Sequence, residues 1–419
     1  MSLPQKLGYL VPQFPGQTHI FFWREIAALE AMGVAPVLFS TRRPPPGLIA
    51  HDWSQAAMAR TTYLGEVSLR RALRVLPRLP WGELLREVGR DGTSVLKDVL
   101  ICAAAGDALR DHCRREGVSH VHVHSCARGA LIAAFARHLG GPGYSLTLHG
   151  PLSDYGRGQR YKWRHARFAT VITRRLIAEM QAEQPADLPP MILRPMGVDT
   201  EYLRRDTPYE PVQPGAPLRV FACGRLNVVK GHQDLIEAVR QLRAAGHDVR
   251  LEIAGQDDAG GSGFRLVLER LIRQHGLGEY VRLLGAIDAA AVKAKLLDAH
   301  VFALASWHEP LGVAYMEAIA CGVPTIGTDA GGVPELIDDG VEGLLVPPKA
   351  PAALAAALLR IAGDPQLAQR LSATGRARIE RDYAARLGAE VIVDQMRKAL
   401  TREGADTRPG PDPGPPGGH

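Results

Sequence analysis

The sequence predicts an α/β protein made of two doubly wound, Rossmann-like domains that face a central cleft. Short apolar runs alternate with longer helical patterns along most of the chain, and a proline-rich stretch interrupts this alternation near the middle. A length of 419 residues is enough for two such domains. We therefore expect a first domain at 1–200, a linker at 201–217 and a second domain at 218–380.

In the first domain, strands and helices are expected to follow one another in turn. The opening run LGYLVP is typical of a buried strand, because parallel strands covered on both faces are almost continuously apolar. A glycine-containing loop and a helical pattern follow it, and similar segments recur further along. We expect strands at 7–12, 35–40, 120–125 and 144–149, and helices at 20–33 and 130–140.

The linker is rich in proline and polar residues, and the alternation restarts after it. A final segment of glycine and proline without apolar anchors is expected to be a disordered tail at 403–419, after a last helix at 381–402. In the second domain we expect strands at 218–224, 249–255, 281–286, 301–306 and 323–328, and helices at 231–246, 264–278, 290–299, 313–322 and 333–340.

Charge and cysteine content restrict the partners and the compartment. A formal net charge of +6 favours an anionic partner such as a nucleotide or an acidic membrane surface. We expect no nucleic-acid binding, because the basic residues share no aromatic-interleaved sheet motif. The five cysteines lack CxxC spacing, and we find neither a signal peptide nor an apolar run of about 18 residues. These features predict a cytoplasmic protein whose membrane contact, if any, is peripheral and on the inner face.

Two glutamates eight residues apart, Glu309 and Glu317, are the first candidate site residues. We expect Glu309 on the loop after a strand and Glu317 in a helix that begins near Gly312. Ligands of open α/β sheets bind at the carboxyl ends of strands, and the backbone N–H groups of Leu311, Gly312 and Val313 would favour a phosphate there. Carboxylates bind sugar hydroxyls well, so the pattern suits a sugar nucleotide. The alternative is a helix N-terminal acid beside a half-exposed glutamate.

Arg225 and Lys230 follow the first strand of the second domain in the segment GRLNVVKGH. Arginine can bind two phosphate oxygens at once and lysine adds a mobile charge, which together fit a diphosphate. The alternative for both residues is solvated surface charge. In the later segment DAGGVPEL, Gly331 and Gly332 allow a close approach of the backbone at another strand end.

The segments GRLNVVKG, HEPLGVAYMEAIACGVP and AGGVPELIDDGVEGLLVPP resemble the retaining glycosyltransferases of the GT-B fold (glycosyltransferase family 4, group 1). The similarity covers positions 8–395, and the segments YLVPQFPGQTHIFFWREIAAL and LTLHGPLSDYG are similar to colanic-acid and exopolysaccharide transferases. The resemblance implies a first domain that binds the acceptor, a second that binds a UDP- or GDP-sugar donor, and a last helix at the domain junction. It also implies transfer, with retained configuration, to a hydroxyl of a lipid-linked saccharide or polysaccharide precursor.

The same resemblance implies roles for the donor-binding residues. Glu309 would contact hydroxyls of the donor sugar, and Glu317 would hold the ribose of the nucleotide. Arg225 and Lys230 would neutralise the diphosphate leaving group. The sequence contains no DxD triplet, so a carboxylate-bound metal is not required and no cofactor is expected.

Two residues of the first domain complete the implied site. His149 would reach the donor sugar near the reacting carbon, and Gly16 would give backbone access near the phosphates or the acceptor. The sequence departs from the subgroup at His19, where a glutamate is common in an SETF-like loop, with Thr18 matching the serine. This departure lies where the acceptor should bind.

Two further segments have alternative interpretations. His120, His122 and His124 alternate along one strand at about 6.6 Å, which is too wide for one metal ion without other ligands. We expect His124 to face the acceptor cleft and the other two histidines to be packed or partly exposed. The basic, amphipathic segment 68–90 could lie as a helix on anionic lipid, or could be an ordinary surface helix.

Alternative functions remain open from the sequence. A related transferase could act on diacylglycerol or on a small molecule. A sugar-nucleotide-binding regulator without turnover, or a sugar-nucleotide epimerase, would use a similar site. Donor turnover and the nature of the product distinguish these functions.

Overall fold

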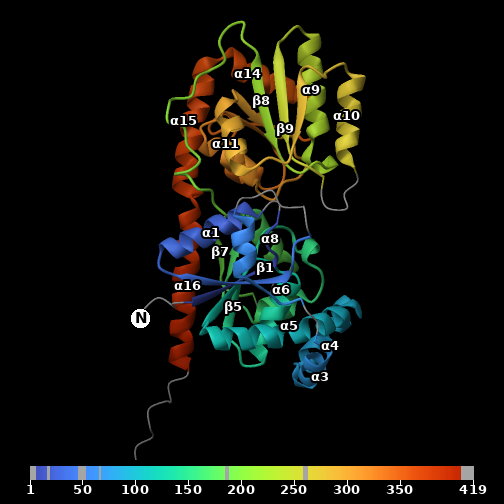
Figure 1. Ribbon diagram of the computed structural model, residues 1–419, viewed down its shortest axis with the longest axis vertical. Helices are drawn as coiled ribbons and strands as arrows, with labels where there is room; N and C mark the ends of the chain where they lie inside the picture. The colour runs from blue at the N-terminus through green and yellow to red at the C-terminus, as the bar shows by residue number, and fades with distance from the viewer. Residues whose placement is uncertain are drawn as a thin grey trace, which may run out of the picture.

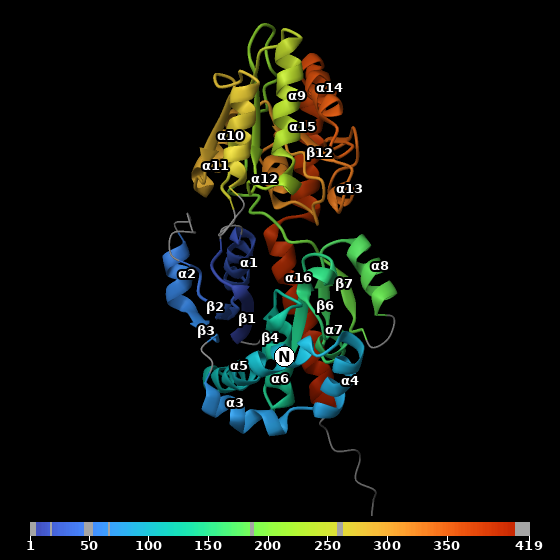
Figure 2. The same ribbon diagram turned by 90° about the vertical axis from the view of Figure 1, so that its right-hand side faces the viewer.

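The computed structural model describes residues 6–16, 19–45, 53–65, 68–184, 188–257 and 263–406. Two β-sheets, each flanked by helices, lie one above the other along the long axis of the molecule (Figures 1 and 2). Within the described residues, the first sheet has seven strands in the order β3–β2–β1–β4–β5–β6–β7, and the second has six in the order β10–β9–β8–β11–β12–β13. The paired strands within each sheet run parallel, so the predicted architecture of two doubly wound α/β domains is confirmed.

The strands of the first sheet are short and lie between residues 6 and 193. They are β1 (Lys6–Gln13), β2 (Ala35–Arg42), β3 (Thr61–Tyr63), β4 (His120–Val123), β5 (Gly143–Leu148), β6 (Ala169–Val171) and β7 (Met191–Leu193). Those of the second sheet are β8 (Leu218–Cys223), β9 (Val249–Ala254), β10 (Val281–Gly285), β11 (Val301–Ala303), β12 (Thr325–Thr328) and β13 (Leu344–Val346).

Helices connect the strands in both domains. The first domain contains α1 (Ile20–Ala31), α2 (Ser54–Arg60), α3 (Leu69–Val75), α4 (Trp81–Asp91), α5 (Ser94–Glu116), α6 (Arg128–His138), α7 (Gln159–Arg164) and α8 (Arg174–Glu183). The second part of the chain contains α9 (His232–Ala244), α10 (Phe264–Gln274), α11 (Ala289–Asp298), α12 (Val313–Ala320), α13 (Val333–Leu336), α14 (Pro351–Gly363), α15 (Pro365–Asp382) and α16 (Ala385–Asp406). Short 3-10 helices lie at Leu76–Arg78, Leu152–Tyr155 and Val228–Lys230.

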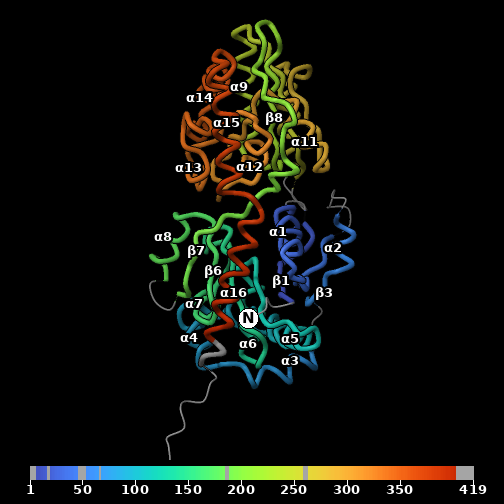
Figure 3. Tube along the Cα trace, turned by 90° about the vertical axis from the view of Figure 1, so that its left-hand side faces the viewer, coloured from blue at the N-terminus to red at the C-terminus, as the bar shows by residue number. Residues whose placement is uncertain are grey.

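Helix α16 leaves the second domain and lies along the first (Figures 1 and 3). It packs against α1, where Ile392, Val393 and Met396 share a buried cluster with Phe22 and Ile26. The chain therefore returns to its first domain, which ties the two domains together through α1. Of the tail predicted at 403–419, residues 407–419 lie outside the described part of the chain, whereas α16 continues to Asp406.

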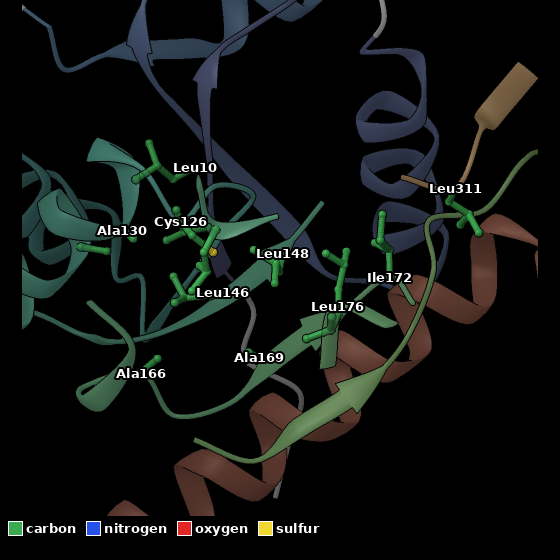
Figure 4. Close-up of a cluster of buried hydrophobic side chains, with 14 of the residues drawn as sticks. Leu10, Cys126, Ala130, Leu146, Leu148, Ala166, Ala169, Ile172, Leu176 and Leu311 are labelled. Carbon is green, nitrogen blue, oxygen red and sulfur yellow. The ribbon is translucent and has the colours of Figure 1, made fainter. Parts of the chain in front are cut away.

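The apolar core is continuous between the two domains. One cluster combines side chains around β4, β5, α5 and α6 with side chains around α12, and Figure 4 shows part of it. Leu311, which precedes α12, belongs to this cluster together with Leu148 and Ile172 of the first domain. The start of α12 is therefore anchored by packing from both sides, which matters for the site described below.

The single helix expected within 68–90 is wrong, because the structure contains two helices there. α3 ends at Val75, a 3-10 turn follows, and α4 begins at Trp81. Pro77 and Pro80 explain the break, because proline has no N–H to donate and disfavours helical geometry in the residue before it. Similarly, the helix expected at 333–340 ends at Leu336, after which the chain becomes extended.

The histidines of β4 belong to the core. His120 and His122 are at most 1% exposed, and their ring nitrogens bond to the hydroxyls of Ser145 and Thr147 at 2.7–2.8 Å. Burial lowers the pKa of the His120 imidazole to about 3, so the ring is neutral at physiological pH. In the described part of the chain, no group of three or more His, Cys, Asp or Glu side chains could hold a metal ion.

Candidate active site

The residues proposed from the sequence converge on one cavity between the two domains. The cavity has a volume of about 780 Å³, and the ends of β8, β9 and β11 and the start of α12 form its second-domain side. The loop after β1 and the residues after β4 and β5 form the other side. The proposed residues that line the cavity are Gly16, His149, Arg225, Lys230, Glu309, Leu311, Gly312, Val313 and Glu317. The structure brings them together, and their individual roles stay predictions.

Charged side chains give the cavity a basic character. Its described lining contains more cationic than anionic side chains, namely Arg24, Arg42, Arg225 and Lys230 against Glu309 and Glu317. The cavity also contains the first turn of α12, whose unpaired backbone N–H groups carry partial positive charge. This combination favours a ligand with several negative charges, such as a diphosphate.

Glu309 lies on the loop between β11 and α12, and its carboxylate is the partner of Lys230. The Lys230 Nζ donates to the Glu309 Oε2, and the Ser306 hydroxyl donates to the same oxygen at 3.2 Å. The Lys230 and Glu309 side chains are only 16% and 12% exposed. A cation suited to phosphate therefore lies directly beside an acceptor suited to sugar hydroxyls.

Two glycines allow the backbone at 331–332 to pack closely against the loop that carries Glu309. Gly331 has φ +64°, and a Cβ there would lie 2.1 Å from the Glu309 carbonyl oxygen. A Cβ at Gly332 would lie 2.0 Å from the Pro310 carbonyl oxygen, and the Gly332 N–H donates to the Glu309 carbonyl at 2.8 Å. The close approach expected at these glycines is therefore to the loop that carries Glu309.

Glu317 lies one turn into α12, and the first turn of this helix lines the cavity. Gly312 caps this helix with φ +99°, and a Cβ there would lie 2.4 Å from the Tyr315 ring, so only glycine fits. The Glu317 Oε1 lies 2.7 Å from the Arg24 Nη1, and the two side chains are 13% and 9% exposed. Arg24 belongs to α1 of the first domain, so this ion pair crosses the cavity from one domain to the other.

Arg225 lies after β8 and is exposed where it lines the cavity. Its backbone carbonyl is 3.3 Å from the Nε2 of buried His232, which fixes the chain between β8 and α9. Lys230 is the last residue of the 3-10 helix that follows, and the Asn227 side chain caps that helix by accepting from the Lys230 N–H at 3.2 Å. The two cations thus come from one short, well-anchored segment.

His149 follows β5 and faces the cavity from the first domain. Its Nε2 lies 3.3 Å from the Nδ1 of His124, and its Nδ1 lies 3.3 Å from the Sδ of Met196. Burial lowers the pKa of both imidazoles to about 3. Both rings are therefore neutral at pH 7, so His149 can orient a hydroxyl group but does not supply positive charge to a leaving group.

A largely buried carboxylate behind His124 was not expected from the sequence. The Tyr9 hydroxyl donates to the Glu25 Oε2 at 2.7 Å, and the same oxygen lies 3.0 Å from the His124 Nε2. Burial raises the pKa of Glu25. Glu25 and Arg24 are adjacent in α1, yet one faces its own domain and the other the second domain. A charged pair within the otherwise apolar segment IFFWREIAAL is the signal that could have identified both.

The sequence comparisons with known proteins match part of this chain. The family model described as glycosyl transferases group 1 matches residues 208–378. A protein assigned as the colanic acid biosynthesis glycosyltransferase WcaL of Salmonella typhimurium is 38% identical over 169 residues, which are 39% of this chain and 40% of that protein. The alpha-D-kanosaminyltransferase of Streptomyces kanamyceticus is 32% identical over 153 residues, which are 36% of this chain and 38% of that protein. The matches thus span about two fifths of the length of these relatives.

The fold of the whole chain has a counterpart among solved structures. HepE of Anabaena in complex with UDP-glucose aligns with a TM-score of 0.69 at 17% identity, over 95% of this chain and 99% of that chain. This likeness shows the fold, and the paired parallel sheets on either side of a cavity are those of the GT-B architecture. Residues 208–378, which make up less than half of the chain, therefore resemble the glycosyl transferases group 1 family.

Proposed function

We propose that this protein is a retaining glycosyltransferase that moves a sugar from a nucleoside diphosphate to a hydroxyl of a lipid-linked saccharide or polysaccharide precursor. The observation that carries the proposal is the convergence of cations, a helix N-terminus and two carboxylates on one interdomain cavity. The relative assigned to colanic acid biosynthesis supports a polysaccharide product. The complex of HepE with UDP-glucose supports a UDP-sugar as the first donor to test, with a GDP-sugar as the second.

In the proposed reaction, Arg225 and Lys230 bind the diphosphate, Glu317 binds the ribose and Glu309 binds hydroxyls of the donor sugar. The bond between the sugar C1 and the diphosphate oxygen breaks, and a bond between C1 and the acceptor oxygen forms on the same face. The acceptor proton passes to the leaving diphosphate. Fixed cations stabilise the negative charge that develops on that group. Because side chains supply these cations, the proposal requires no metal ion or other cofactor.

The first domain completes the proposed site. His149 orients the donor sugar near C1, and the neutral state of its ring leaves charge stabilisation to the second domain. Gly16 offers its backbone near the phosphates or the acceptor, since the loop after β1 lines the same cavity. A Cβ at Gly16 would lie 2.6 Å from the His19 ring, so a larger residue would disturb this loop.

The experiment that tests the proposed function combines donor binding with product analysis. We expect one of UDP-, GDP- or ADP-sugars to raise the melting temperature of the protein. With that donor and a bacterial lipid extract, mass spectrometry should detect a lipid-linked saccharide extended by one sugar. Conversion of the donor without any acceptor would instead indicate an epimerase, and binding without turnover would indicate a regulatory protein.

A second acceptor class has support from one relative. The D-inositol 3-phosphate glycosyltransferase of Streptomyces bingchenggensis is 32% identical over 191 residues, which are 44% of this chain and 42% of that protein, and its name gives a small molecule, inositol phosphate. Transfer to a small soluble acceptor would give a product in the aqueous phase, and transfer to diacylglycerol would give a simple glycolipid. The same product analysis therefore separates these acceptors from a growing polysaccharide.

We also propose that the first domain docks on an anionic membrane through α3, α4 and the start of α5. Figures 1 and 2 place α3 and α4 at the end of the first domain that lies away from the second domain. Within 68–100, the exposed charged residues are basic, whereas the four acidic residues are half-buried or buried. Four leucines of these helices are 52–71% exposed, namely Leu69, Leu73, Leu85 and Leu100, whereas Leu84 is buried. Interleaved leucines and basic residues suit a bilayer rich in anionic lipid. In the described part of the chain, no helix is long and apolar enough to span a membrane.

We expect the protein to sediment with vesicles that contain phosphatidylglycerol and not with phosphatidylcholine vesicles. Replacing Arg70 and Arg74 with alanine should weaken this binding by about 1 kcal/mol for each charge. The Leu69→Ser/Leu73→Ser variant should weaken it as well, whereas Leu266→Ser, at an equally exposed leucine of α10, should not. Equal binding of all variants, or equal binding to both kinds of vesicle, would contradict the proposed docking.

A further inference from the structure

The ion pair between Arg24 and Glu317 is a contact between the two domains at the cavity itself. Arg24 lies in α1 of the first domain and Glu317 in α12 of the second, and their charged atoms are 2.7 Å apart. Both side chains are about nine-tenths buried. The pair can form only when the two domains lie close together, as they do in this structure.

Both ends of the ion pair have rigid supports. Helix α1 buries Phe22 and Ile26 and packs against α16, so Arg24 cannot move far without shifting the first domain. Helix α12 buries Tyr315 and Met316 on the side of its own core. The position of the Glu317 carboxylate is therefore set from both domains.

Burial makes this contact sensitive to the loss of either partner. Taking two charges out of water is costly, and their mutual attraction offsets that cost only while both are present. Removing one partner leaves the other charge buried without compensation, and opening of the cleft would rehydrate it. A buried pair of this kind should therefore favour the closed arrangement of the domains, and its loss should favour an open one.

A second contact across the cleft is more exposed. The Glu335 carboxylate, in α13 of the second domain, accepts from the backbone N–H groups of Arg174 and Arg175 at 2.7 and 3.0 Å. These N–H groups begin α8 of the first domain, where a negative charge is favourable. Because this contact is exposed to solvent, water and salt weaken it more than the buried pair.

We propose that Arg24 is a positioning residue that holds the Glu317 carboxylate in place for the nucleotide ribose and keeps the two domains closed over the donor. A carboxylate has lone pairs for about four hydrogen bonds, so one oxygen can stay with Arg24 while ribose hydroxyls bind the other. Arg24 also offsets the charge of Glu317, which lowers its repulsion of the incoming diphosphate. The ribose part of this inference rests on the proposed function, whereas the closure of the domains does not.

Small-angle X-ray scattering of the unliganded protein tests the closure directly. We expect a larger radius of gyration for Arg24→Ala and for Glu317→Ala than for the wild type. The charge-reversed double variant, Arg24→Glu/Glu317→Arg, should return the radius to the wild-type value. Arg60→Ala is the matched control, because it breaks an ion pair of the same helix α1, with Glu30, without touching the second domain. If Arg24→Ala is as compact as this control, the proposed closure is wrong.

Calorimetric titration with UDP, or with GDP if the wild type prefers it, separates the two parts of the inference. Arg24→Ala should bind the nucleotide about tenfold more weakly, the change expected for a lost charge-assisted contact. Arg24→Lys keeps the charge, so its nucleotide affinity should lie between those of the wild type and Arg24→Ala. An intermediate affinity would also show that misfolding does not cause the loss of binding. The double variant Arg24→Glu/Glu317→Arg should be compact yet bind the nucleotide poorly, because a guanidinium group cannot accept a hydrogen bond from a ribose hydroxyl.

Unchanged or tighter nucleotide binding by Arg24→Ala would overturn the positioning role. Absence of nucleotide binding by the wild type would instead overturn the proposed function and leave the scattering result intact.

Discussion

Replacing Lys230 with alanine is expected to weaken nucleotide-sugar binding by about 1–3 kcal/mol and to lower the transfer rate about 100-fold. The Lys230 ammonium group lies in the cavity beside Glu309, and both side chains are largely buried. Its removal takes away a cation that would stabilise the leaving diphosphate and leaves the Glu309 carboxylate without its partner. Calorimetric titration with the preferred donor gives the affinity, and a turnover assay gives the rate.

Lys295→Ala provides the matched control for Lys230. Lys295 also pairs with a glutamate, Glu252, at 2.6 Å, and it lies in the same domain but does not line the cavity. We expect its loss to leave donor affinity and transfer unchanged. An unchanged donor affinity in Lys230→Ala, together with intact folding, would show that the diphosphate binds elsewhere.

The second large effect is expected for Gly331→Ala, at a position that touches no ligand in the proposed site. The added Cβ would meet the Glu309 carbonyl oxygen at 2.1 Å, so the loop that carries Glu309 must move. Displacing a sugar-binding group by about 1 Å can lower a reaction rate about 100-fold. We therefore expect a loss of transfer of this size, measured with the preferred donor, in a protein that still folds.

Gly340→Ala separates displacement of the loop from backbone strain. Gly340 has φ +77°, so alanine there has a conformational cost similar to that at Gly331, but nothing lies within 4 Å of its added Cβ. Both variants should lose about 1 kcal/mol of stability from the left-handed backbone conformation, and only Gly331→Ala should lose activity as well. Equal activity of the two variants would show that the Glu309 loop does not need this close packing.

The fold was predictable from the sequence because parallel strands and their covering helices have different apolar periods. The strand expected at 301–306 and the helix expected at 313–322 place Glu309 between them, and the structure has this arrangement. Proline is the local exception. The apolar pattern of 68–90 continues across Pro77 and Pro80, so the pattern suggested one helix, whereas the missing N–H groups divide it into two.

The second-domain part of the candidate site was predictable because its residues follow successive strand ends along the chain. Parallel strands bring their carboxyl ends to one edge of the second sheet, and this edge carries Arg225, Lys230, Glu309 and the start of α12. The contacts of Arg24 and Glu25 were not predictable in this way. Their partners lie far away in sequence, and only the packing of α1 between α16 and the cavity decides which side chain faces which domain.

The most direct measurement is a crystal structure of the protein soaked with the UDP- or GDP-sugar that binds best. The account predicts a diphosphate in contact with Arg225 and Lys230 at the first turn of α12, the ribose on Glu317 and the sugar hydroxyls on Glu309. A donor bound outside the interdomain cavity, or one whose diphosphate contacts neither Arg225 nor Lys230, would contradict it.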